Sequence, residues 1–476
     1  MDLASRDSNL GIVIITLLLC TILLLVSIFV RGKKSDKTLP PLIEEGFFAS
    51  LSNLLGPKGH EWLVQKTLSI NSKVYRLPLT PPGYQFIIVA DANLAREILY
   101  DPTTMKFKPF FKNLDKFSGG PGILTSEGFR YKHARKAIMP VFGSDYNNQM
   151  ITCISKFVDI WISTKLQNVI QNGESVDINL EMQLITSKII SEFGFQYDLT
   201  EEQASKIISG FKALMKEYLQ DNILNPTREY FWYFYTGAKA ARDAKNDMVG
   251  LMYEILYAHR NKGDKAPQGI IIDIIDKNPN YLNDHDRVND IILFIGAGYE
   301  TTAGALSWAL YLLAKDLSYQ TKLRSVIRSI SEEEAYHHAM VRNVIREALR
   351  LYPPGATGNP RVLGRDFTYN GLLLPKGSIF TTPPYVIQRD PDYFENPNEF
   401  LPSRWDSPTQ SMLNAYQPFS IGRRNCMGMS LAYLETQIVL VKLIKDYEFT
   451  TQGECDSYFN FLLLPQNLRL IPKKIE

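Results

Sequence analysis

The pattern of hydrophobic and polar positions divides the chain into a helical middle and two β-rich flanks. From about residue 125 to about residue 350, apolar residues recur mostly with helical spacing. Before this region, residues 73–79 and 84–90 predict two strands joined by a turn at Pro81-Pro82-Gly83, and after Pro353 short strands return. Strands so distant in sequence must pair across the helical region. The pattern therefore predicts one unit, mainly α, with a smaller β-rich part made from both ends.

Local signals fix three further elements. Asp91 is expected to cap a helix that runs to Leu99. The stretch 367–380 reads as a hairpin around Asn370-Gly371, a pair that favours tight turns. Near the C-terminus, apolar periodicity predicts a helix over 430–447.

The stretch Leu10 to Val30 carries no charged residue. At about 1.5 Å per helical residue it spans roughly 30 Å, the hydrocarbon thickness of a bilayer. We therefore expect a short tail over 1–9, a transmembrane helix over 10–30, a linker over 31–46 and a catalytic domain over 47–476. The alternative is a cleaved signal peptide, whose apolar part would be shorter. Basic residues cluster after the span, which places the rest of the chain in the cytosol.

Composition narrows the class of protein. The chain has 476 residues, with 52 basic and 50 acidic side chains. Such a balance argues against a nucleic-acid binder, which needs a strongly basic face. The four cysteines are scattered, without disulfide or zinc spacing, which agrees with a reducing cytosol.

A helix expected over 286–317 is apolar almost all round and should be buried. Its middle nevertheless contains glycines that each cost about 1 kcal/mol in a helix interior, together with polar residues: Gly296, Gly298, Gly304, Glu300, Thr301 and Thr302. One interpretation is a site where a flat ligand approaches the backbone and a carboxyl beside a hydroxyl relays protons. The other is a helix-packing notch with a threonine bonded to its own helix.

Charged pairs occur nearer the C-terminus. Glu347 and Arg350 are three residues apart and share a helix face. On this evidence alone a solvated salt bridge is the favoured interpretation, worth a few tenths of a kcal/mol at most. Arg404 stands beside an aromatic residue in a stretch rich in turn formers.

The stretch FSIGRRNCMG, from Phe419 to Gly428, surrounds Cys426 with glycines and arginines. A structural cysteine needs no such glycines, and no histidine lies near in sequence to activate a nucleophile. A thiolate bound to a planar cofactor accounts for more. Gly422 and Gly428 would permit a tight loop close to a flat ring, Arg424 would pair with its acidic edge, and Phe419 would shield the sulfur.

This stretch matches F-x-x-G-x-R-x-C-x-G, so the chain resembles the cytochrome P-450 monooxygenases, microsomal members included, over roughly residues 40–476. The resemblance implies the P-450 fold, non-covalent haem b and Cys426 as the iron ligand. It implies that Thr301 and Glu300, within AGYETT (297–302), serve O₂ activation near Gly298. Further residues take family roles: Glu347, Arg350 and Arg404 as a structural network, and Arg361 as a ligand of a haem propionate.

Two positions depart from the family pattern. Tyr131 stands where the family usually has tryptophan, although Arg135 is retained, and both are expected to contact a propionate. Members resembling fatty-acid ω-hydroxylases often carry a glutamate, used to attach haem covalently, where this chain has Ala297. This difference is the basis for expecting non-covalent haem.

The expected function is oxidation of a C–H bond in a lipophilic small molecule such as an isoprenoid or fatty substrate, with O₂ and electrons from NADPH. No dinucleotide fingerprint is present. A NADPH–cytochrome P-450 reductase at the endoplasmic reticulum membrane is therefore implied as partner, docked on Arg423, Lys442 and Lys445 unless these are ordinary solvated charges. The alternatives are a peroxide isomerase or dehydratase of this fold and a non-enzymatic haem sensor.

Two aromatic clusters bear on the substrate. Residues 106–117 alternate phenylalanines with four lysines, Lys106, Lys108, Lys112 and Lys116. They predict a lipophilic substrate with an anionic end, unless the lysines contact lipid headgroups instead. Residues 230–235, YFWYFY, fall where the resemblance places a loop that dips into the membrane.

Overall fold

The computed structural model describes residues 37–80 and 84–476. The transmembrane helix expected over 10–30, its preceding tail and the turn at 81–83 lie outside the described residues. Within the described part of the chain, no helix is both long enough and apolar enough to cross a membrane. Residues 40–43 of the expected linker pack on the first strand, where the Ile43 N–H donates to the Arg76 carbonyl at 3.1 Å.

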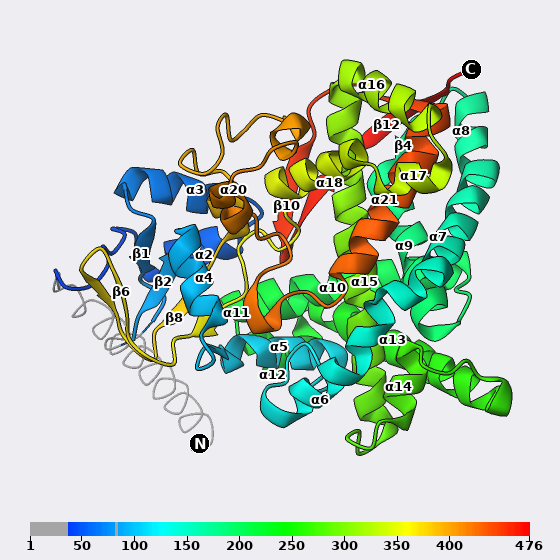
Figure 1. Ribbon diagram of the computed structural model, residues 1–476. Coiled ribbons are helices and arrows are strands. Elements are labelled where there is room, and N and C mark those ends of the chain that lie inside the picture. The colour runs from blue at the N-terminus through cyan, green and yellow to red at the C-terminus, as the bar shows by residue number, and fades with distance from the viewer. Residues whose placement is uncertain (1–36, 81–83) are drawn as a thin grey trace, which may run out of the picture.

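The molecule is mainly helical with a smaller β-rich part, as the sequence predicts (Figure 1). The helices of the first half are α2 (Phe47–Leu55), α3 (Gly59–Ile70), α4 (Ala92–Tyr100), α5 (Lys108–Ser118), α6 (Gly128–Ile138), α7 (Asn147–Trp161), α8 (Gln167–Gln171), α9 (Ile178–Phe195), α10 (Glu201–Lys216), α11 (Asn222–Leu224) and α12 (Thr227–Tyr230). Those of the second half are α13 (Thr236–Asn261), α14 (Ile271–Lys277), α15 (Asp284–Lys315), α16 (Leu317–Arg328), α17 (Glu332–His337), α18 (Ala339–Leu351), α19 (Pro384–Ile387), α20 (Gln410–Ala415) and α21 (Met429–Asp446).

The main sheet joins the two ends of the chain, as the spacing of the predicted strands requires. Its order is β1 (Val74–Leu77), β2 (Phe86–Val89), β8 (Ile379–Thr381), β5 (Arg361–Val362) and β3 (Met105–Lys106). Strands β2 and β8 are parallel, with Ile88 opposite Thr381. The remaining strands form a three-stranded sheet, β4 (Val176–Asp177), β12 (Arg469–Lys474) and β9 (Tyr447–Thr451), and two hairpins, β6 (Phe367–Tyr369) with β7 (Leu372–Leu374) and β10 (Asp456–Asn460) with β11 (Leu462–Gln466).

Local sequence explains the predicted elements near the sheet. The Asp91 carboxylate accepts hydrogen bonds from the N–H groups of Asn93 and Leu94, at 3.0 and 2.8 Å, and so caps α4. The Asn370-Gly371 turn has positive φ at both residues, which this dipeptide adopts readily. The predicted hairpin is shorter than expected, however, because residues 379–381 leave it and pair with β2 and β5.

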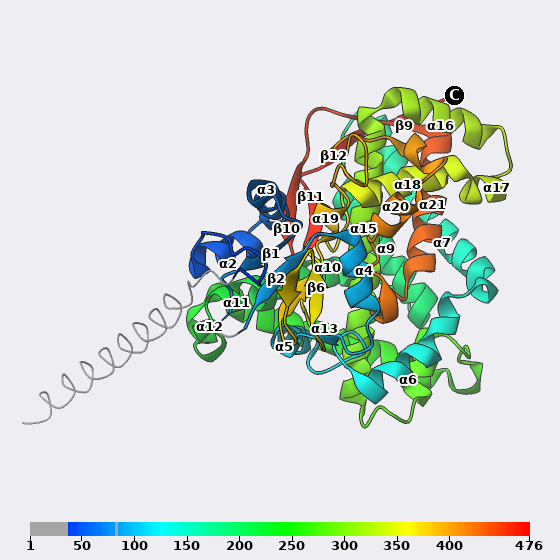
Figure 2. The ribbon, with the colours of Figure 1, turned by 60° about the vertical axis from the view of Figure 1, so that its left-hand side comes forward.

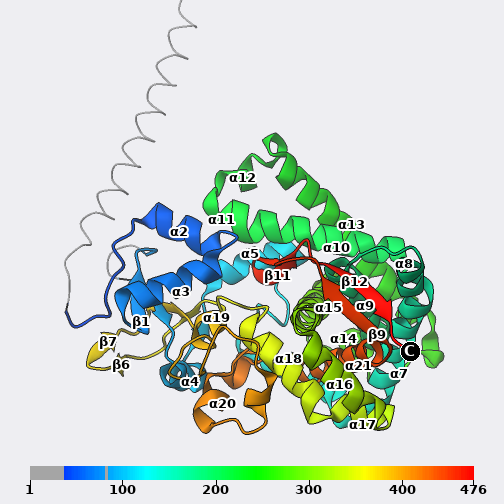
Figure 3. The same cartoon turned by 90° about the horizontal axis from the view of Figure 1, so that it is seen from above.

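Helix α15 runs through the middle of the helical body, and Figure 3 shows it nearly end-on. The Asn283 side chain caps its first turn, and residues 302–314 are buried without interruption. Its glycines lie where other elements come close. A Cβ atom at Gly296 would sit 2.1 Å from the Phe211 ring, and one at Gly304 would sit 2.8 Å from the Leu464 side chain. Close packing therefore explains these two glycines.

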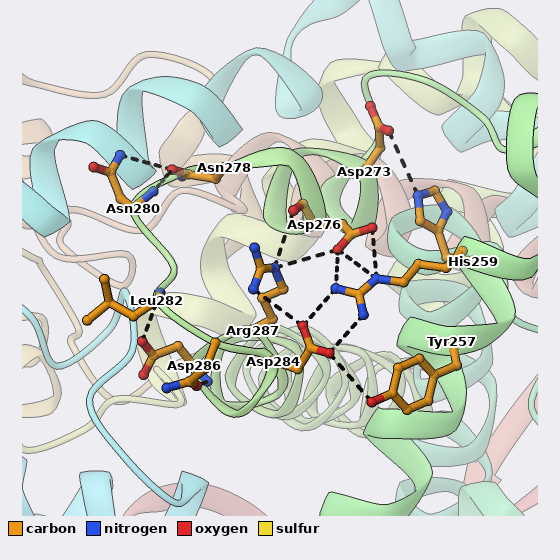
Figure 4. Close-up of polar contacts among 12 residues, drawn as sticks. Tyr257, His259, Asp273, Asp276, Asn278, Asn280, Leu282, Asp284, Asp286 and Arg287 are labelled. Atoms are coloured by element: carbon orange, nitrogen blue, oxygen red, sulfur yellow. Dashed lines mark hydrogen bonds and ion pairs between the residues drawn. The ribbon is translucent and has the colours of Figure 1, made fainter.

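Ion pairs hold the first turn of α15 against α13 and α14 (Figure 4). The Arg260 guanidinium lies 2.7 Å from both the Asp276 and the Asp284 carboxylates. Arg287 reaches the same two carboxylates at 3.5 and 3.3 Å. The Tyr257 hydroxyl donates to Asp284 at 3.5 Å. These ion pairs fix the position of the N-terminal end of α15 relative to α13 and α14.

Candidate active site

A cavity of about 660 Å³ lies between α15, α5, the main sheet and the Cys426 loop. Its walls are largely apolar and rich in phenylalanine. The polar lining includes Lys106, Tyr131, Arg135, Arg361 and Arg424, and over residues 37–80 and 84–476 no aspartate or glutamate lines it. A large apolar cavity with a few convergent polar groups is the usual form of a small-molecule site.

The Cys426 loop is a tight turn whose sulfur faces this cavity. Gly422 has φ of +76°, and a Cβ there would lie 2.3 Å from the Leu99 carbonyl oxygen, so only glycine fits. The Cys426 N–H donates to the Phe419 carbonyl at 2.9 Å, which closes the loop. The sulfur is deep inside the molecule but accessible from the cavity. Burial raises the pKa of the thiol, and the Gly428 N–H and Arg135 oppose this rise.

The other loop residues also border the cavity. The Phe419 ring packs on Tyr433, with 5.1 Å between ring centroids, beside the sulfur. A Cβ at Gly428 would meet no described atom within 4 Å. That glycine leaves an open patch of cavity wall next to the sulfur. Such a patch suits the face of a planar group bound through the thiolate.

The opposite wall is the middle of α15. Thr301 lines the cavity, and its hydroxyl donates to the Ala297 carbonyl at 2.7 Å. Glu300 is buried and does not line the cavity, and burial raises the pKa of its carboxyl to about 7. Its Oε2 has no hydrogen-bond partner among the described residues. The structure therefore does not bring the Glu300 carboxyl to the Thr301 hydroxyl, because consecutive residues on a helix point in different directions.

Gly298 borders the cavity, but the side chain of another helix occupies the position that a Cβ atom would take. That atom would lie 2.7 Å from Cγ1 of Ile190 on α9. The packing notch considered from the sequence is therefore present at Gly298, as at its neighbours on α15. Close approach of a cofactor is not needed to explain this glycine.

Helix α6 braces the back of the cysteine loop. The Arg135 guanidinium donates to the Asn425 carbonyl at 2.9 Å and to the Asn425 side-chain oxygen at 2.6 Å. The Tyr131 hydroxyl donates to the Arg423 carbonyl at 2.9 Å. The Arg424 guanidinium stacks over the Tyr131 ring and donates to the Ser126 carbonyl at 2.8 Å. The expected contact residues thus lie together at the site, but most of their hydrogen bonds are made to protein.

A cluster of cations at one end of the cavity lacks balancing charge. Lys106 and Arg361 are directly opposite each other on β3 and β5, and they are only 9% and 8% exposed. The Lys106 ammonium lies over the Phe111 ring at 4.5 Å. Within the described chain neither side chain has a carboxylate partner, and Arg424 has only Glu127 at 4.0 Å. Like charges directly opposite in a sheet destabilise it unless an anion lies between them.

The pKa values reflect this lack of balance. Burial, Arg424 and Arg361 lower the pKa of Lys106 to about 7. Burial and Arg424 lower the pKa of Arg361 to about 10. A planar group whose acidic edge reached these cations while its face lay over Gly428 would fit the site. The two propionates of haem have this chemistry, so the residues present fit the cofactor that the resemblance implies.

Sequence reasoning missed the position of Lys106, which it assigned to the substrate. The four lysines of residues 106–117 have different surroundings. Lys116 pairs with Glu229 at 2.6 Å, whereas Lys108 and Lys112 are exposed and do not line the cavity. The phenylalanines of this segment, Phe107, Phe110, Phe111 and Phe117, all line it.

Glu347, Arg350 and Arg404 are brought together beside the site. Arg350 binds the Glu347 carboxylate through two bonds of 2.9 Å, and Arg404 adds a third of 2.9 Å. The Trp405 indole N–H also donates to Glu347 at 2.9 Å, a partner that sequence reasoning did not identify. Both members of the Glu347–Arg350 pair are 0% exposed. The solvated salt bridge favoured from the residues alone is therefore wrong.

The basic surface considered for a redox partner is partly neutralised. Lys442 lies 2.9 Å from Asp159 and 3.3 Å from Glu332, and Lys445 lies 3.4 Å from Glu332. Arg423 is exposed. Exposed basic residues on α6, Lys132 and Lys136, lie on the helix that braces the cysteine loop.

Comparison with known proteins gives one consistent result. A family model described as "Cytochrome P450" matches residues 63–472. Cytochrome P450 3A13 of Mus musculus is 29% identical over 370 residues, which are 71% of this chain and 72% of the relative. A cytokinin hydroxylase of Arabidopsis thaliana is 28% identical over 353 residues, covering 69% and 66%. Cytochrome P450 3A6 of Oryctolagus cuniculus is 27% identical over 353 residues, covering 69% and 70%.

Proposed function

Because this chain belongs to the cytochrome P450 family and is a monooxygenase of that family, we propose that it hydroxylates a lipophilic small molecule. The observation that supports this proposal is the cavity, where an accessible thiol faces phenylalanine-rich walls and one end is cationic. Two relatives from Arabidopsis thaliana are named cytokinin hydroxylases, and hydroxylation is therefore the type of oxidation that we propose.

We propose that Cys426 ligates the iron of non-covalently bound haem b. The ring would lie on Gly428 and beside Phe419, and its propionates would lie among Arg361, Arg424 and Lys106. Arg135 and Tyr131 would stabilise the cysteine loop through hydrogen bonds to its backbone carbonyls and would not bind the cofactor directly. Glu347, Arg350 and Arg404 would keep the supporting segments in place. Haem bound through a thiolate supplies the chemistry that activates O₂.

Thr301 borders the cavity from α15, as does Thr302, and we propose that the Thr301 hydroxyl donates a hydrogen bond on the haem side of the cavity. Glu300 would act from behind as a buried acid. Its carboxyl has a pKa of about 7, raised by burial. It can therefore hold a proton near neutral pH, and a water would have to carry that proton to the cavity, which the carboxyl itself does not line. A peroxide isomerase or dehydratase, the first alternative, needs no such proton supply.

The substrate would reach the cavity from a membrane. Exposed aromatic residues gather on α2 and around α12, and Figures 2 and 3 both place these helices at the same end of the molecule. They are Phe48, Tyr230, Phe231, Tyr233 and Phe234, which are 50–78% exposed. The two tyrosines are amphipathic and favour the membrane interface, and the three phenylalanines supply exposed apolar surface that can enter a lipid layer. We propose an endoplasmic reticulum membrane and NADPH–cytochrome P450 reductase as electron donor, with the basic surface of α6 and Arg423 as its docking face.

The test is the spectrum of the reduced, CO-bound enzyme after Cys426→Ser. Loss of the thiolate-type band is expected, because a hydroxyl is a poor replacement for a thiolate. Retention of that band would overturn the assignment of Cys426.

A second measurement separates a monooxygenase from a haem sensor. With reductase and a lipophilic substrate, Thr301→Ala should still consume NADPH while hydrogen peroxide is released and product falls. A sensor would not consume NADPH in a substrate-dependent way. Unchanged coupling in this variant would show that Thr301 has no part in proton delivery.

A further inference from the structure

One part of the cavity wall differs from the cysteine-loop side in charge. It is formed by α5, the π-helical turn Glu217–Asp221, α11 and residues 459–462, and we call it the α5 wall. These segments are fully described, and none of their charged side chains lines the cavity. Their polar lining residues are three carboxamides, Asn113, Gln220 and Asn460, and the other lining residues of the α5 wall are apolar.

Asn113 is the one polar residue on the face of α5 that lines the cavity. Phe110 and Phe117 share this face with it, because residues three and four apart on a helix are neighbours. Phe110 packs on Phe461 with 6.1 Å between ring centroids, and Phe117 packs on Phe211 at 4.8 Å. A polar side chain on an otherwise apolar, inward face indicates a functional role.

The Asn113 amide is open to a ligand. The side chain is half-buried, lines the cavity and makes no hydrogen bond with the described residues. Its oxygen and nitrogen are not among the described buried atoms that lack a partner, so both can be reached from the cavity. The amide can therefore both donate to a ligand and accept from it.

Gln220 provides an acceptor whose orientation is fixed. Its side-chain N–H donates at 2.8 Å to the carbonyl of Leu55, the last residue of α2. A carbonyl oxygen can only accept, so this bond assigns the nitrogen of Gln220 to Leu55. The Gln220 side-chain oxygen has no partner in the described chain and is not among the buried unpaired atoms. A ligand group that binds this oxygen must donate a hydrogen bond.

We propose that the substrate carries a neutral hydrogen-bond donor, such as a hydroxyl group, and that Gln220 and Asn113 bind it. The hydroxyl would donate to the Gln220 oxygen and accept from the Asn113 nitrogen. Helix α5 and the π-helical turn pack against each other, so the two side chains belong to adjoining parts of the α5 wall.

A carboxylate suits this wall less well. It has no proton to donate to the Gln220 oxygen, and no cation of the α5 wall would offset the water that it loses. Of the four lysines in residues 106–117, only Lys106 lines the cavity, and it lies opposite Arg361. A neutral donor thus takes the place of the anionic end expected from the sequence.

Binding at the α5 wall has a consequence for the products, and this step rests on the proposed function. A hydroxyl held by Gln220 limits which carbon of the substrate reaches the thiolate. In turnover with reductase, Gln220→Met should therefore spread hydroxylation over more carbons of octan-1-ol. A general loss of folded enzyme would instead lower all products in proportion.

The primary test measures binding without use of haem chemistry. Octan-1-ol, 1-methoxyheptane and octanoate are titrated calorimetrically against the detergent-solubilised, haem-bound full chain. The ether is an isomer of the alcohol that can accept but cannot donate, so octan-1-ol should bind about five-fold more tightly. Octanoate should bind about ten-fold or more weakly than octan-1-ol, because its charge has no partner at this wall.

Two variants separate the two amides. Gln220→Met removes the acceptor, so octan-1-ol binding should fall about five-fold, to that of the ether, and ether binding should not change. Asn113→Leu removes the donor and should weaken the alcohol and the ether alike. Its melting temperature should not fall, because the Asn113 amide has no protein partner. Gln149→Met, at an exposed position of α7 outside the cavity, is the matched control.

Asn113→Asp tests the same position by a gain of binding. It keeps the shape of the side chain and adds a carboxylate, which forms a charged hydrogen bond with an ammonium group. Octan-1-amine should therefore bind this variant about ten-fold or more tightly than it binds the original protein.

The proposal is overturned if octan-1-ol binds no better than 1-methoxyheptane or octanoate, or if it does not bind measurably. It is also overturned if Gln220→Met weakens alcohol binding no more than Gln149→Met, or if Asn113→Asp gains no affinity for the amine. Because calorimetry uses neither the CO spectrum nor product formation, this failure is distinct from failure of the Cys426 assignment.

Discussion

The protein contains two buried clusters of charged side chains, and they differ in how completely the protein itself satisfies them. In the first, Glu347 accepts hydrogen bonds from Arg350, Arg404 and Trp405, and Arg350 also donates to the carbonyls of Gln388, Pro397 and Glu399. In the second, Lys106 and Arg361 face each other across two strands, and in the described chain neither side chain has a carboxylate within ion-pair distance. The protein alone satisfies the first cluster, whereas we propose that an anionic ligand completes the second.

The contrast distinguishes a structural cluster from a binding site. A buried ion pair with all its hydrogen bonds made resists change, because removal of one partner leaves the other charge buried. A buried group of like charges weakens the free protein and strengthens its complex with an anion. Removal of one charge should therefore destabilise the protein in the first cluster and should not destabilise the ligand-free protein in the second.

The largest effect is expected for Glu347→Gln. It leaves Arg350 and Arg404 buried without a carboxylate, and losses of this kind cost about 3–5 kcal/mol. The variant should accumulate mostly as unfolded or haem-free protein, measured by denaturant unfolding and haem content. Glu399→Gln is the control, because that side chain is exposed nearby. Equal stability of the two variants would contradict the comparison.

In contrast to Glu347→Gln, Lys106→Met and Arg361→Met should not lower the free energy of unfolding of the haem-free chain. Each removes one of two facing cations, so the haem-free variants should be at least as stable as the original protein. Haem should dissociate about ten-fold or more faster, since each loses a charged hydrogen bond to a propionate. The measurement is the rate of haem transfer to a competing haem-binding protein, with Lys108→Met as the exposed control. Unchanged haem retention would remove the second cluster from the cofactor site.

The pH dependence of stability should reveal the same cluster. The folded haem-free chain holds Lys106 with a pKa of about 7, lowered by burial, Arg424 and Arg361 and opposed by Glu127 and Asp115. The unfolded chain keeps an ordinary lysine pKa near 10.4. Between these values the unfolded state binds more protons, so the free energy of unfolding should rise by about 2 kcal/mol from pH 7 to pH 9.

That rise should be absent in Lys106→Met and in the haem-bound protein, where a propionate would keep Lys106 charged. Denaturant unfolding at a series of pH values provides the measurement. An identical pH profile for the haem-free protein and Lys106→Met would show that Lys106 remains charged throughout.

The smallest effect is expected for Tyr131→Phe. The hydroxyl donates to the Arg423 carbonyl and accepts from Arg135 at 3.0 Å, so its loss should cost about 1 kcal/mol of stability. Haem retention should change little, because the hydroxyl is satisfied by protein. If the rate of haem loss instead rose as in Arg361→Met, Tyr131 would belong with the ligand-binding cluster.

Much of the fold followed from local sequence. The Asp91 cap, the Asn370-Gly371 turn and the long buried helix are short-range features that the sequence states directly. The pairing of β3 with β5 could not be predicted, because both strands have only two residues and they lie far apart. For that reason Lys106 was assigned to the substrate and its place beside Arg361 was missed.

The candidate site shows the same limit. The Cys426 loop was predicted because its residues are contiguous, and Gly422 adopts the backbone conformation that the pattern requires. The burial of Glu347 could not be predicted from α18 alone, since its second and third side-chain partners, Arg404 and Trp405, lie on a separate segment. The separation of Glu300 from Thr301 could have been foreseen, because adjacent helical residues do not share a face.

Ile88 pairs with Thr381, and Lys106 pairs with Arg361. The two members of each pair are translated far apart in time, so the main sheet cannot be completed early in synthesis. At about 5–20 residues per second, the partner of Ile88 is made about 15–60 s after it. During that interval the edge of β2 that later pairs with β8 has no neighbouring strand. The cationic end of the cavity is complete only after Arg361 has been made, and Cys426 is made later still. Capture of haem therefore belongs to the last moments of translation or to the time after release from the ribosome.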